Sequence, residues 1–427
     1  MPIQLCNFSF TLSQGLRLCL GAFRTTPVHS LYVEANEPPL WYRREKLAMQ
    51  YYLKLKANPD NPAYNLVFHP QYETKFLAKP REIPPFALRI SGLMEEAGIN
   101  INNIMANTIP NNPVWVAPEP TVLFNLTWYE KSSTAPEIYR TYFYQLLNKY
   151  KEFCPIYTDG SKQQEKVACA FVTPYSTSAV CLPDNASIYT AEAVAILRAL
   201  NYCEVSLIQN FIICSDSLSV LQAIENQECK NPIISSLLEQ LYIALNARKN
   251  IIFCWIPGHS GIAGNETADQ AAKAAITNGL PNVLWNNISI PCSDFIPIIK
   301  PYLNRKWQLA WDESHQQRPK KLYSIKPVVN THSAHYKNRK EQVILTRLRL
   351  GHTRLTHAYL IEREPAPICH YCNDTVTVKH ILIDCPELDQ YRRQYYTQIH
   401  SMEDLFKNIS HSSIINYLKT IGAYHRL

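Results

Sequence analysis

Four acidic residues stand where a folded sheet could bring their side chains together. Asp159 follows the apolar run CPIYT, and Asp216 follows the apolar run FIIC. Glu192 and Asp269 lie near the starts of two stretches that are rich in helix-forming residues. Converging carboxylates repel one another unless protons or cations neutralise them, and oxygen-rich clusters suit Mg²⁺ or Mn²⁺. Two such ions can activate water and stabilise a leaving oxygen in phosphodiester hydrolysis.

Each acid also has a simpler explanation, because an acid at a strand end, such as Asp159, is usually a turn former or a helix cap. Asp216 could cap the helix predicted over SLSVLQAI (217–224), where Ser217 is a second candidate cap. Glu192 and Asp269 could complement the positive N-terminal ends of their helices. Taken one at a time, these structural explanations are the stronger ones, so the catalytic hypothesis depends on the four acids meeting.

The segment GHSGIAGNETAD (258–269) favours such a meeting. It follows a predicted strand, opens a predicted helix and contains Gly258, Gly261 and Gly264, which permit a tight loop. His259 on this loop could exchange a proton with a reacting phosphate or help the product to leave. Alternatively, His259 is a loop residue with no chemical role.

The elements that would position these residues alternate between strand and helix patterns. Short apolar runs predict strands, and stretches free of Gly and Pro predict helices, with Asn265 or Thr267 as the cap of the last helix. The order βββαβαβα predicts an α/β fold with a mixed sheet and helices on its faces. The expected strands are 154–158, 167–172, 179–182, 211–214 and 251–256, and the expected helices are 190–203, 217–224 and 265–276.

Residues 154–277 resemble a type 1 ribonuclease H domain. The resemblance rests on YTDGS (157–161), TAEAVAI (190–196), SDSLSVL (215–221) and GHSGIAGNETADQAAK (258–273), in that order. It implies a ribonuclease H-like sheet and cleavage of the RNA strand of RNA–DNA hybrids with two Mg²⁺ or Mn²⁺ ions. The implied metal ligands are Asp159, Glu192, Asp216 and Asp269, with His259 as a further catalytic residue. Gly160, Ser161 and Asn265 are the implied substrate contacts.

A second group of residues predicts a zinc site near the C-terminus. Three cysteines and one histidine follow the pattern Cys-x₂-Cys-x₇-His-x₄-Cys, a donor set that suits tetrahedral zinc. The alternative is chance proximity in a reduced protein. His352 and His357, further upstream, are assigned to the surface of a basic helix instead. The four candidate ligands are Cys369, Cys372, His380 and Cys385.

Positive charge is concentrated just before this motif. Between Lys300 and Arg363 there are fourteen basic and four acidic residues, a net charge of +10, whereas the whole chain carries +7. Such a surface could bind the phosphates of RNA or DNA, because basic residues release counterions from nucleic acids. The simpler interpretation is a solvated basic connection.

The flanking regions resemble a jockey-like non-LTR retrotransposon polyprotein. RLRLGHTRLTHAYLI (347–361) and the Cys–His motif are similar to the region after the ribonuclease H domain, and residues 15–55 are similar to the segment after the polymerase palm. The resemblance implies a nucleic-acid-binding zinc element and a reverse transcriptase as a candidate partner. Because no Tyr-x-Asp-Asp motif occurs, we expect no polymerase activity from this chain alone. It would then be the C-terminal part of a polyprotein.

These observations divide the chain of 427 residues into five regions. Prolines recurring between Asn58 and Pro120 indicate a linker, and those after residue 278 indicate a connection. A helical, thumb-like region is followed by a Pro-containing linker, the ribonuclease H domain, a basic connection, and a small basic region with the zinc motif. Their predicted ranges are 1–105, 106–150, 151–278, 279–330 and 331–427.

Composition excludes several other classes of protein. No apolar run reaches the roughly 20 residues that span a bilayer, so we expect no membrane partner. An odd number of scattered cysteines, 13, and the lack of a secretory signal indicate an intracellular protein of the nucleus or cytoplasm. The leading hypothesis is a metal-dependent hybrid ribonuclease. The alternative is a catalytically silent nucleic-acid-binding remnant of a mobile element.

Overall fold

The computed structural model describes most of the chain as two compact units. Unit 1 comprises residues 1–47 and 300–427, and unit 2 comprises residues 48–299. This division does not follow the boundaries predicted at residues 105 and 330. The described residues are 3–70, 73–78, 84–107, 119–130, 133–227, 231–278, 288–331 and 338–427.

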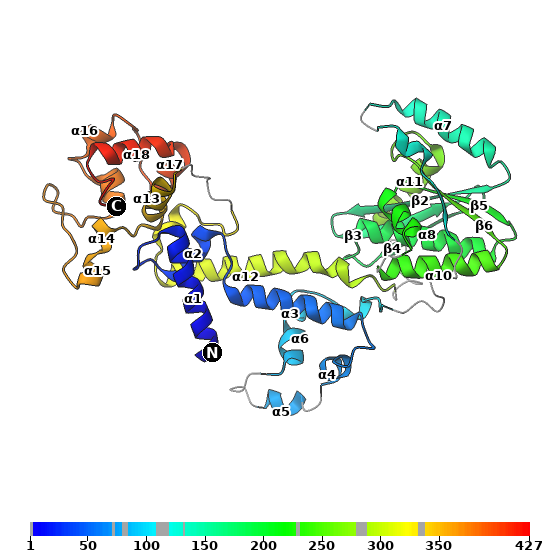
Figure 1. Ribbon diagram of the computed structural model, residues 1–427, viewed down its shortest axis with the longest axis horizontal. Helices are drawn as coiled ribbons and strands as arrows, with labels where there is room; N and C mark the ends of the chain where they lie inside the picture. The colour runs from blue at the N-terminus through cyan, green and yellow to red at the C-terminus, as the bar shows by residue number, and fades with distance from the viewer. Residues whose placement is uncertain are drawn as a thin grey trace. The chain divides into compact units, whose positions relative to one another are not determined.

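Unit 2 is built around a six-stranded mixed sheet (Figure 1). The strand order is β1-β6-β5-β2-β3-β4; β1, β6, β5 and β2 run parallel, and β3 and β4 are antiparallel to their neighbours. The predicted α/β fold is confirmed. The strands are β1 (Thr121–Leu123), β2 (Cys154–Gln163), β3 (Lys166–Val172), β4 (Thr177–Leu182), β5 (Asn210–Ser215) and β6 (Asn250–Trp255).

The predicted strands form because their apolar runs are buried on both faces of the sheet. In β5, the residues Phe211 to Cys214 are all fully buried, as expected for an inner parallel strand. The first strand is longer than predicted: β2 continues through the polar residues to Gln163, in register with β3. Asp159 therefore lies within a strand, opposite Ala170, and not at a strand end.

Helices cover both faces of this sheet. α8 (Ile188–Val205) packs on β2 and β3, with α9 (Leu218–Glu225) and α10 (Pro232–Asn246) beside it. α11 (Ala263–Asn278) packs on the other face of the sheet. Successive residues of a strand point to opposite faces, so Gly160 and Tyr157, three residues apart on β2, face opposite sides. Gly160 lies against α8, and Tyr157 lies against α11. In Figure 1, α7 (Pro136–Lys149) lies on the side of the sheet opposite α10.

The predicted linker 106–150 contains two elements of this layered structure. β1 pairs in parallel with β6 and extends the sheet, and α7 buries Tyr139 and Phe143 against β5 and β6. The part from Thr121 to Lys149 is thus not a linker. In this part, apolar residues recur at helical spacing only after Pro136, and the prolines before it obscure the pattern. Residues 108–118 of the predicted linker lie outside the described ranges.

The existence of the helices was predicted more accurately than the residues at which they begin. Ser187 caps α8, since its side chain accepts a hydrogen bond from the Thr190 amide. Ser217 is the N-cap residue of α9, as predicted, but its side chain makes no capping hydrogen bond. α11 begins at Ala263, which places both proposed caps, Asn265 and Thr267, inside the helix.

None of the helices in the described ranges is long and apolar enough to cross a membrane.

The remaining helices of unit 2 confirm that the chain before the sheet is largely helical. α3 (Leu40–Lys56) and α12 (Ile296–Gln317) each contain a boundary between the units. The other elements are α4 (Tyr64–Phe68), α5 (Glu73–Leu77), α6 (Phe86–Glu96), and the 3₁₀ turns Ile101–Asn103, Asn125–Trp128 and Cys292–Phe295.

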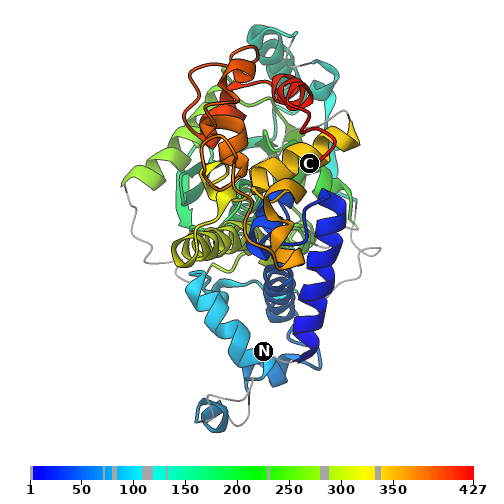
Figure 2. The same ribbon diagram turned by 90° about the vertical axis from the view of Figure 1, so that its left-hand side faces the viewer.

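Unit 1 joins the two ends of the sequence in one helical body. α1 (Ile3–Leu20), α2 (Val28–Ala35) and α13 (Arg339–Leu350) pack together, as Figure 2 shows for α1 and α13. A separate apolar core is formed between α13 and α18 (His411–Thr420). The other elements are a 3₁₀ turn (Lys321–Ser324), α14 (Arg354–His357), α15 (Tyr359–Glu362), a π-helical turn (His380–Asp384), α16 (Asp389–Arg392) and α17 (Met402–Asn408).

Several residues of the basic segment 300–363 hold this unit together. Arg349 forms two hydrogen bonds with Glu34, whose side chain is only 3% exposed. Arg347 donates to the carbonyl groups of Gly21 and Leu427, and Lys326 is buried. These three bases are structural and are not available to a ligand. Lys337 lies outside the described residues.

The packing of α7 can be tested through its central side chain. Phe143→Ala should destabilise unit 2 by about 3–4 kcal/mol, because Phe143 is fully buried and its removal leaves a cavity. Hydrogen–deuterium exchange of β5 and β6 peptides would report the loss. Tyr144→Ala, at a neighbouring side chain that is 49% exposed, should cost less than about 1 kcal/mol. Equal protection in both variants would show that α7 does not stabilise the sheet.

Candidate active site

Three of the four predicted acids meet where the parallel pairing between β2 and β5 ends. Asp159 comes from β2, Glu192 from α8 and Asp216 from the residue directly after β5. Each offers one carboxylate oxygen, and these three oxygen atoms lie within 4.8 Å of one another. The parallel pairing of β2 with β5 brings Thr158 opposite Ser215, which carries the next residues, Asp159 and Asp216, to the same place.

Gly160 lets Glu192 reach this centre. A β-carbon at Gly160 would lie 2.9 Å from both the Ala191 side chain and the Glu192 amide nitrogen, closer than atoms normally approach. The absence of a side chain therefore allows α8 to approach β2 closely. The Gly160 amide also donates a hydrogen bond to the Glu192 carboxylate. The helix and the strand are thus joined at the residue next to Asp159.

The meeting of these acids raises their affinity for protons. Burial, followed by the charges of Asp216 and Asp269, raises the pKa of Asp159 to about 8. Burial and the charges of Asp216 and Asp159 raise the pKa of Glu192 well above its ordinary value. Since the groups interact, their protons are shared by the cluster. At neutral pH the centre therefore holds protons unless cations replace them.

Two oxygen atoms of the centre are unsatisfied within the described structure. Asp159 Oδ2 and Glu192 Oε2 are buried and have no hydrogen-bond partner there. Leaving buried carboxylate oxygens unpaired is costly, so such atoms indicate a missing ligand. A donor set made only of carboxylate oxygens fits hard cations such as Mg²⁺ or Mn²⁺.

The fourth predicted acid belongs to an adjoining group. Asp269 lies within hydrogen-bonding reach of Asp159, and it pairs with Lys273 at 2.7 Å. Ligand atoms of Asp269, His259 and Glu266 lie within 4.8 Å of one another. Asp269 therefore connects the three-carboxylate centre to the loop histidine.

Glu266 is a site residue that the sequence analysis missed. It lies three residues before Asp269 on α11, a spacing that places both side chains on one helix face. Its carboxylate also accepts a hydrogen bond from the Gly261 amide, at 3.4 Å. The signal was present in NETAD, but the glutamate there has the ordinary appearance of an acid in a first helical turn.

The loop between β6 and α11 carries His259 at the surface. His259 is exposed and has a positive φ angle of 58°, so the backbone turns sharply at this residue. Gly264, predicted to belong to the loop, lies instead in the first turn of α11. The histidine is therefore held next to the acids but remains open to solvent.

The predicted substrate contacts occupy different environments. Ser161 is buried on β2, and Gly160 is engaged with Glu192 as described above. Asn265 is 3% exposed, and its Oδ1 atom has no hydrogen-bond partner within the described ranges. Such a buried, unpaired amide oxygen needs a partner, which keeps Asn265 a candidate for substrate contact.

The four predicted zinc ligands converge in unit 1. One donor atom from each of Cys369, Cys372, His380 and Cys385 lies within 4.8 Å of the others. The Cys372 sulfur lies 3.4 Å from His380 Nε2. Backbone amides of Cys372 and Tyr371, with His380, lower the pKa of Cys369 to about 6. A thiolate is the form that binds zinc, so this environment fits the metal.

His352 and His357 do not lie on a basic helix surface as predicted. They are half-buried and in contact, with ring centroids 3.9 Å apart. Burial and the nearby His357 lower the pKa of His352 to about 3, and its Nδ1 atom lies 2.9 Å from the Thr25 hydroxyl. His352 is therefore uncharged at neutral pH, and the pair lies in a half-buried part of unit 1.

Comparison with known proteins agrees with the geometry of unit 2. Residues 151–277 match the family model described as RNase H. This part of the chain is similar to RNase H domains, and its mixed sheet is consistent with an RNase H-like fold. It includes β2 to β6 and α8 to α11, but neither β1 nor α7.

Retroviral Pol polyproteins are similar over nearly the same length of sequence. Those of two equine infectious anemia virus isolates, 1369 and CL22, are 30% identical over 122 residues, and that of strain Wyoming is 31% identical. The match covers 28% of this chain and 10% of each viral protein. The chain thus matches about a tenth of the length of these relatives.

The raised pKa of Asp159 predicts a pH-dependent stability in the absence of divalent ions. Between about pH 4 and pH 8 the folded protein holds a proton that the unfolded chain releases, so the free energy of unfolding falls as pH rises. Asp159→Asn removes this charge and should stabilise unit 2 at pH 8 by about 1–3 kcal/mol. Urea unfolding in a chelator, followed by hydrogen exchange of β2 and β5, measures the effect.

The exposed acid Asp184 provides the matched control for this experiment. Asp184→Asn changes the net charge by the same amount outside the cluster and should leave the pH profile unchanged. An identical profile in Asp159→Asn and the parent protein would contradict the assignment of the titrating group.

Proposed function

We propose that this chain is an endonuclease that hydrolyses the RNA strand of RNA–DNA hybrids with the help of two divalent ions. The proposal is carried by the carboxylates of Asp159, Glu192 and Asp216, which meet within the segment that matches RNase H and include two buried oxygen atoms with no partner in the described ranges. RNase H domains act on hybrids, which supports this substrate class.

In this proposal the acids have separate tasks. Asp159, Glu192 and Asp216 would hold Mg²⁺ or Mn²⁺, with Asp269 completing the set beside Asp159. When bound, such ions lower the pKa of water and stabilise the departing oxygen of the cleaved phosphodiester. The Gly160 amide keeps the Glu192 carboxylate oriented, and burial keeps bulk water away from the centre.

His259 is suited to proton transfer at the edge of the site. Its exposed ring can take up a proton at Nδ1 or Nε2 from solvent and pass it to the oxygen of the product strand. One carboxylate oxygen from each of Glu266 and Asp269 lies within 4.8 Å of a ring nitrogen of His259, which keeps the ring beside the acids.

Recognition of RNA requires contacts to the 2′-hydroxyl groups that DNA lacks. Asn265 and the main chain around Gly160 and Ser161 are proposed for this role, because Gly160 and Ser161 follow Asp159 on β2 and Asn265 lies one helical turn before Asp269 on α11. The unpaired Oδ1 of Asn265 can accept a hydrogen bond from such a hydroxyl.

We also propose that the chain derives from a retrotransposon polyprotein and acts with a reverse transcriptase supplied by another chain. A reverse transcriptase makes the hybrids that this domain would degrade, and viral proteins that match the domain are Pol polyproteins. The jockey-like relationship proposed from residues 347–361 and 15–55 belongs to this hypothesis.

The activity is tested with a labelled RNA–DNA hybrid in Mg²⁺. The parent chain should cleave the RNA strand, and Asp159→Asn should lower kcat by at least about a hundredfold, because it removes a ligand of the metals. Asp184→Asn should retain full activity. Cleavage in a chelator, or equal activity in all three proteins, would refute the metal-dependent mechanism.

The same assay decides the alternative function. If the parent chain binds the hybrid but never cleaves it, the protein is a catalytically silent nucleic-acid-binding remnant. If it cleaves duplex DNA as readily as the hybrid, the proposed RNA selectivity is wrong.

We further propose that the Cys–His motif binds zinc and contributes to RNA or DNA binding. Its four donors already converge, and the short loop between Cys369 and Cys372 is closed by a hydrogen bond of 2.9 Å from the Asn373 amide to the Cys369 carbonyl. Zinc would hold the segment 367–386 folded onto the rest of unit 1.

Cys372→Ser should lower bound zinc to less than about a tenth of one equivalent, since it removes one of four ligands. Cys292→Ser, which changes a half-buried cysteine of unit 2, should retain zinc. Metal analysis of the purified proteins measures this. The nuclease centre should keep its activity in both variants, and full zinc in Cys372→Ser would exclude the site.

A further inference from the structure

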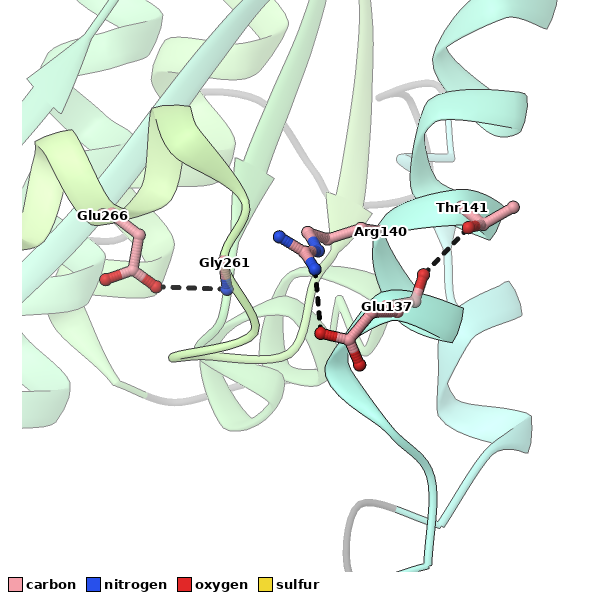
Figure 3. Close-up of polar contacts among 5 residues, drawn as sticks. All are labelled: Glu137, Arg140, Thr141, Gly261 and Glu266. Atoms are coloured by element: carbon pink, nitrogen blue, oxygen red, sulfur yellow. Dashed lines mark hydrogen bonds and ion pairs between the residues drawn. The ribbon is translucent and has the colours of Figure 1, made fainter.

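The helix that precedes the RNase H match reaches the edge of the candidate active site. α7 lies before residue 151, yet Tyr139 and Phe143 anchor it on the same core as Ile256 and Ile262, which bracket the His259 loop. Its first turns therefore lie beside that loop. Figure 3 shows this arrangement, with α7 on one side and the loop before α11 on the other.

Arg140 is the residue of α7 that touches the loop. Its Nη1 atom lies 3.2 Å, and its Cδ atom 3.3 Å, from the position that a β-carbon on Gly261 would occupy. Gly261 has a φ angle of 73°, so glycine is favoured there both by the backbone and by the guanidinium group packed against it. This contact lies two residues from His259.

The guanidinium group of Arg140 is only partly engaged by the protein. Nη2 pairs with Glu137 Oε1 at 2.9 Å, whereas no residue in the described ranges accepts a hydrogen bond from Nη1 or Nε. The side chain is 40% exposed. By contrast, Lys273, a base on α11, is paired with Asp269. Arg140 thus presents N–H donors without an acceptor in the described ranges, beside the loop that carries His259.

We propose that Arg140 is a substrate-binding residue that contacts a backbone phosphate of the nucleic acid beside the cleaved one. A planar guanidinium with free donors is well suited to a phosphate group. Its stem rests on Gly261, so little conformational freedom would be lost on binding. This inference rests on the proposed hybrid ribonuclease function, and it extends the binding surface to α7, outside the matched domain.

The position of Glu137 gives the site a built-in competitor. The Glu137 carboxylate pairs with Nη2 of Arg140, and its negative charge repels a phosphate group. Removing that charge should therefore strengthen binding, whereas removing the arginine should weaken it. Opposite effects from two neighbours on one helix would not arise from general destabilisation.

The test measures the binding of a labelled hybrid to full-length chains that carry Asp159→Asn, so that the ligand stays intact in Mg²⁺. Arg140→Gln should weaken binding about three- to tenfold and reduce the slope of log K against log salt concentration by about 1. Glu137→Gln should strengthen binding. Lys149→Gln, which removes a base from the last turn of the same helix, is the matched control and should change little.

Steady-state cleavage by chains with Asp159 intact separates binding from loop positioning. Arg140→Gln should raise KM with little change in kcat, and Arg140→Lys should restore part of the affinity. An unchanged affinity and salt slope, or a loss confined to kcat, would overturn the phosphate contact while leaving the ribonuclease proposal intact. If the parent chain neither binds nor cleaves the hybrid, the proposed function itself fails, and the role of Arg140 with it.

Discussion

Mutual repulsion among buried carboxylates is the constraint that governs unit 2. Asp159, Glu192 and Asp216 would move apart if their backbones were free to do so, because like charges at this separation disfavour the ionised state. They stay together since two parallel strands and one closely packed helix fix their positions. The site is thus prepared for cations by the rigidity of the fold, and the protons that it holds at neutral pH occupy the place of those cations.

The same rigidity relates the acids to the rest of the domain. Gly160 sets how near α8 comes to β2, and α11 brings Asp269 and Glu266 from the other face. The loop with His259 is held between α11 and α7. A substitution that changes any of these contacts would alter the separation of the carboxylates. We therefore expect such a substitution to change the activity and the proton affinity of the carboxylates together.

Much of this fold could be predicted from the sequence, because buried strands and Ala-rich helices leave clear local patterns. The order of strands and helices and the three central acids belong to this part. Positions within elements were less accessible: β2 outlasts its apolar run because residues 159–163 pair with the next strand, β3, in a hairpin, and the polar side chains among them do not indicate a buried strand. β1 and α7 were hidden by surrounding prolines.

The roles of the basic residues also depended on distant contacts. Charge alone left a phosphate-binding surface over 300–363 open beside the simpler solvated connection, but Arg347 and Arg349 bond to groups more than 300 residues away in the sequence. Conversely, Arg140 was inconspicuous in the sequence, since a single arginine in an expected linker carries no signal. Its significance comes from a loop more than 100 residues further along the chain.

The pairing of β1 with β6 has a consequence for how this domain can be isolated. β6 would become an open edge of the sheet in a fragment that starts at residue 151, and the apolar face beneath α7 would meet water. Unprotected strand edges and apolar patches promote self-association. The smallest stable fragment therefore begins before Thr121, and shorter recombinant versions should aggregate on expression even when every catalytic side chain is present.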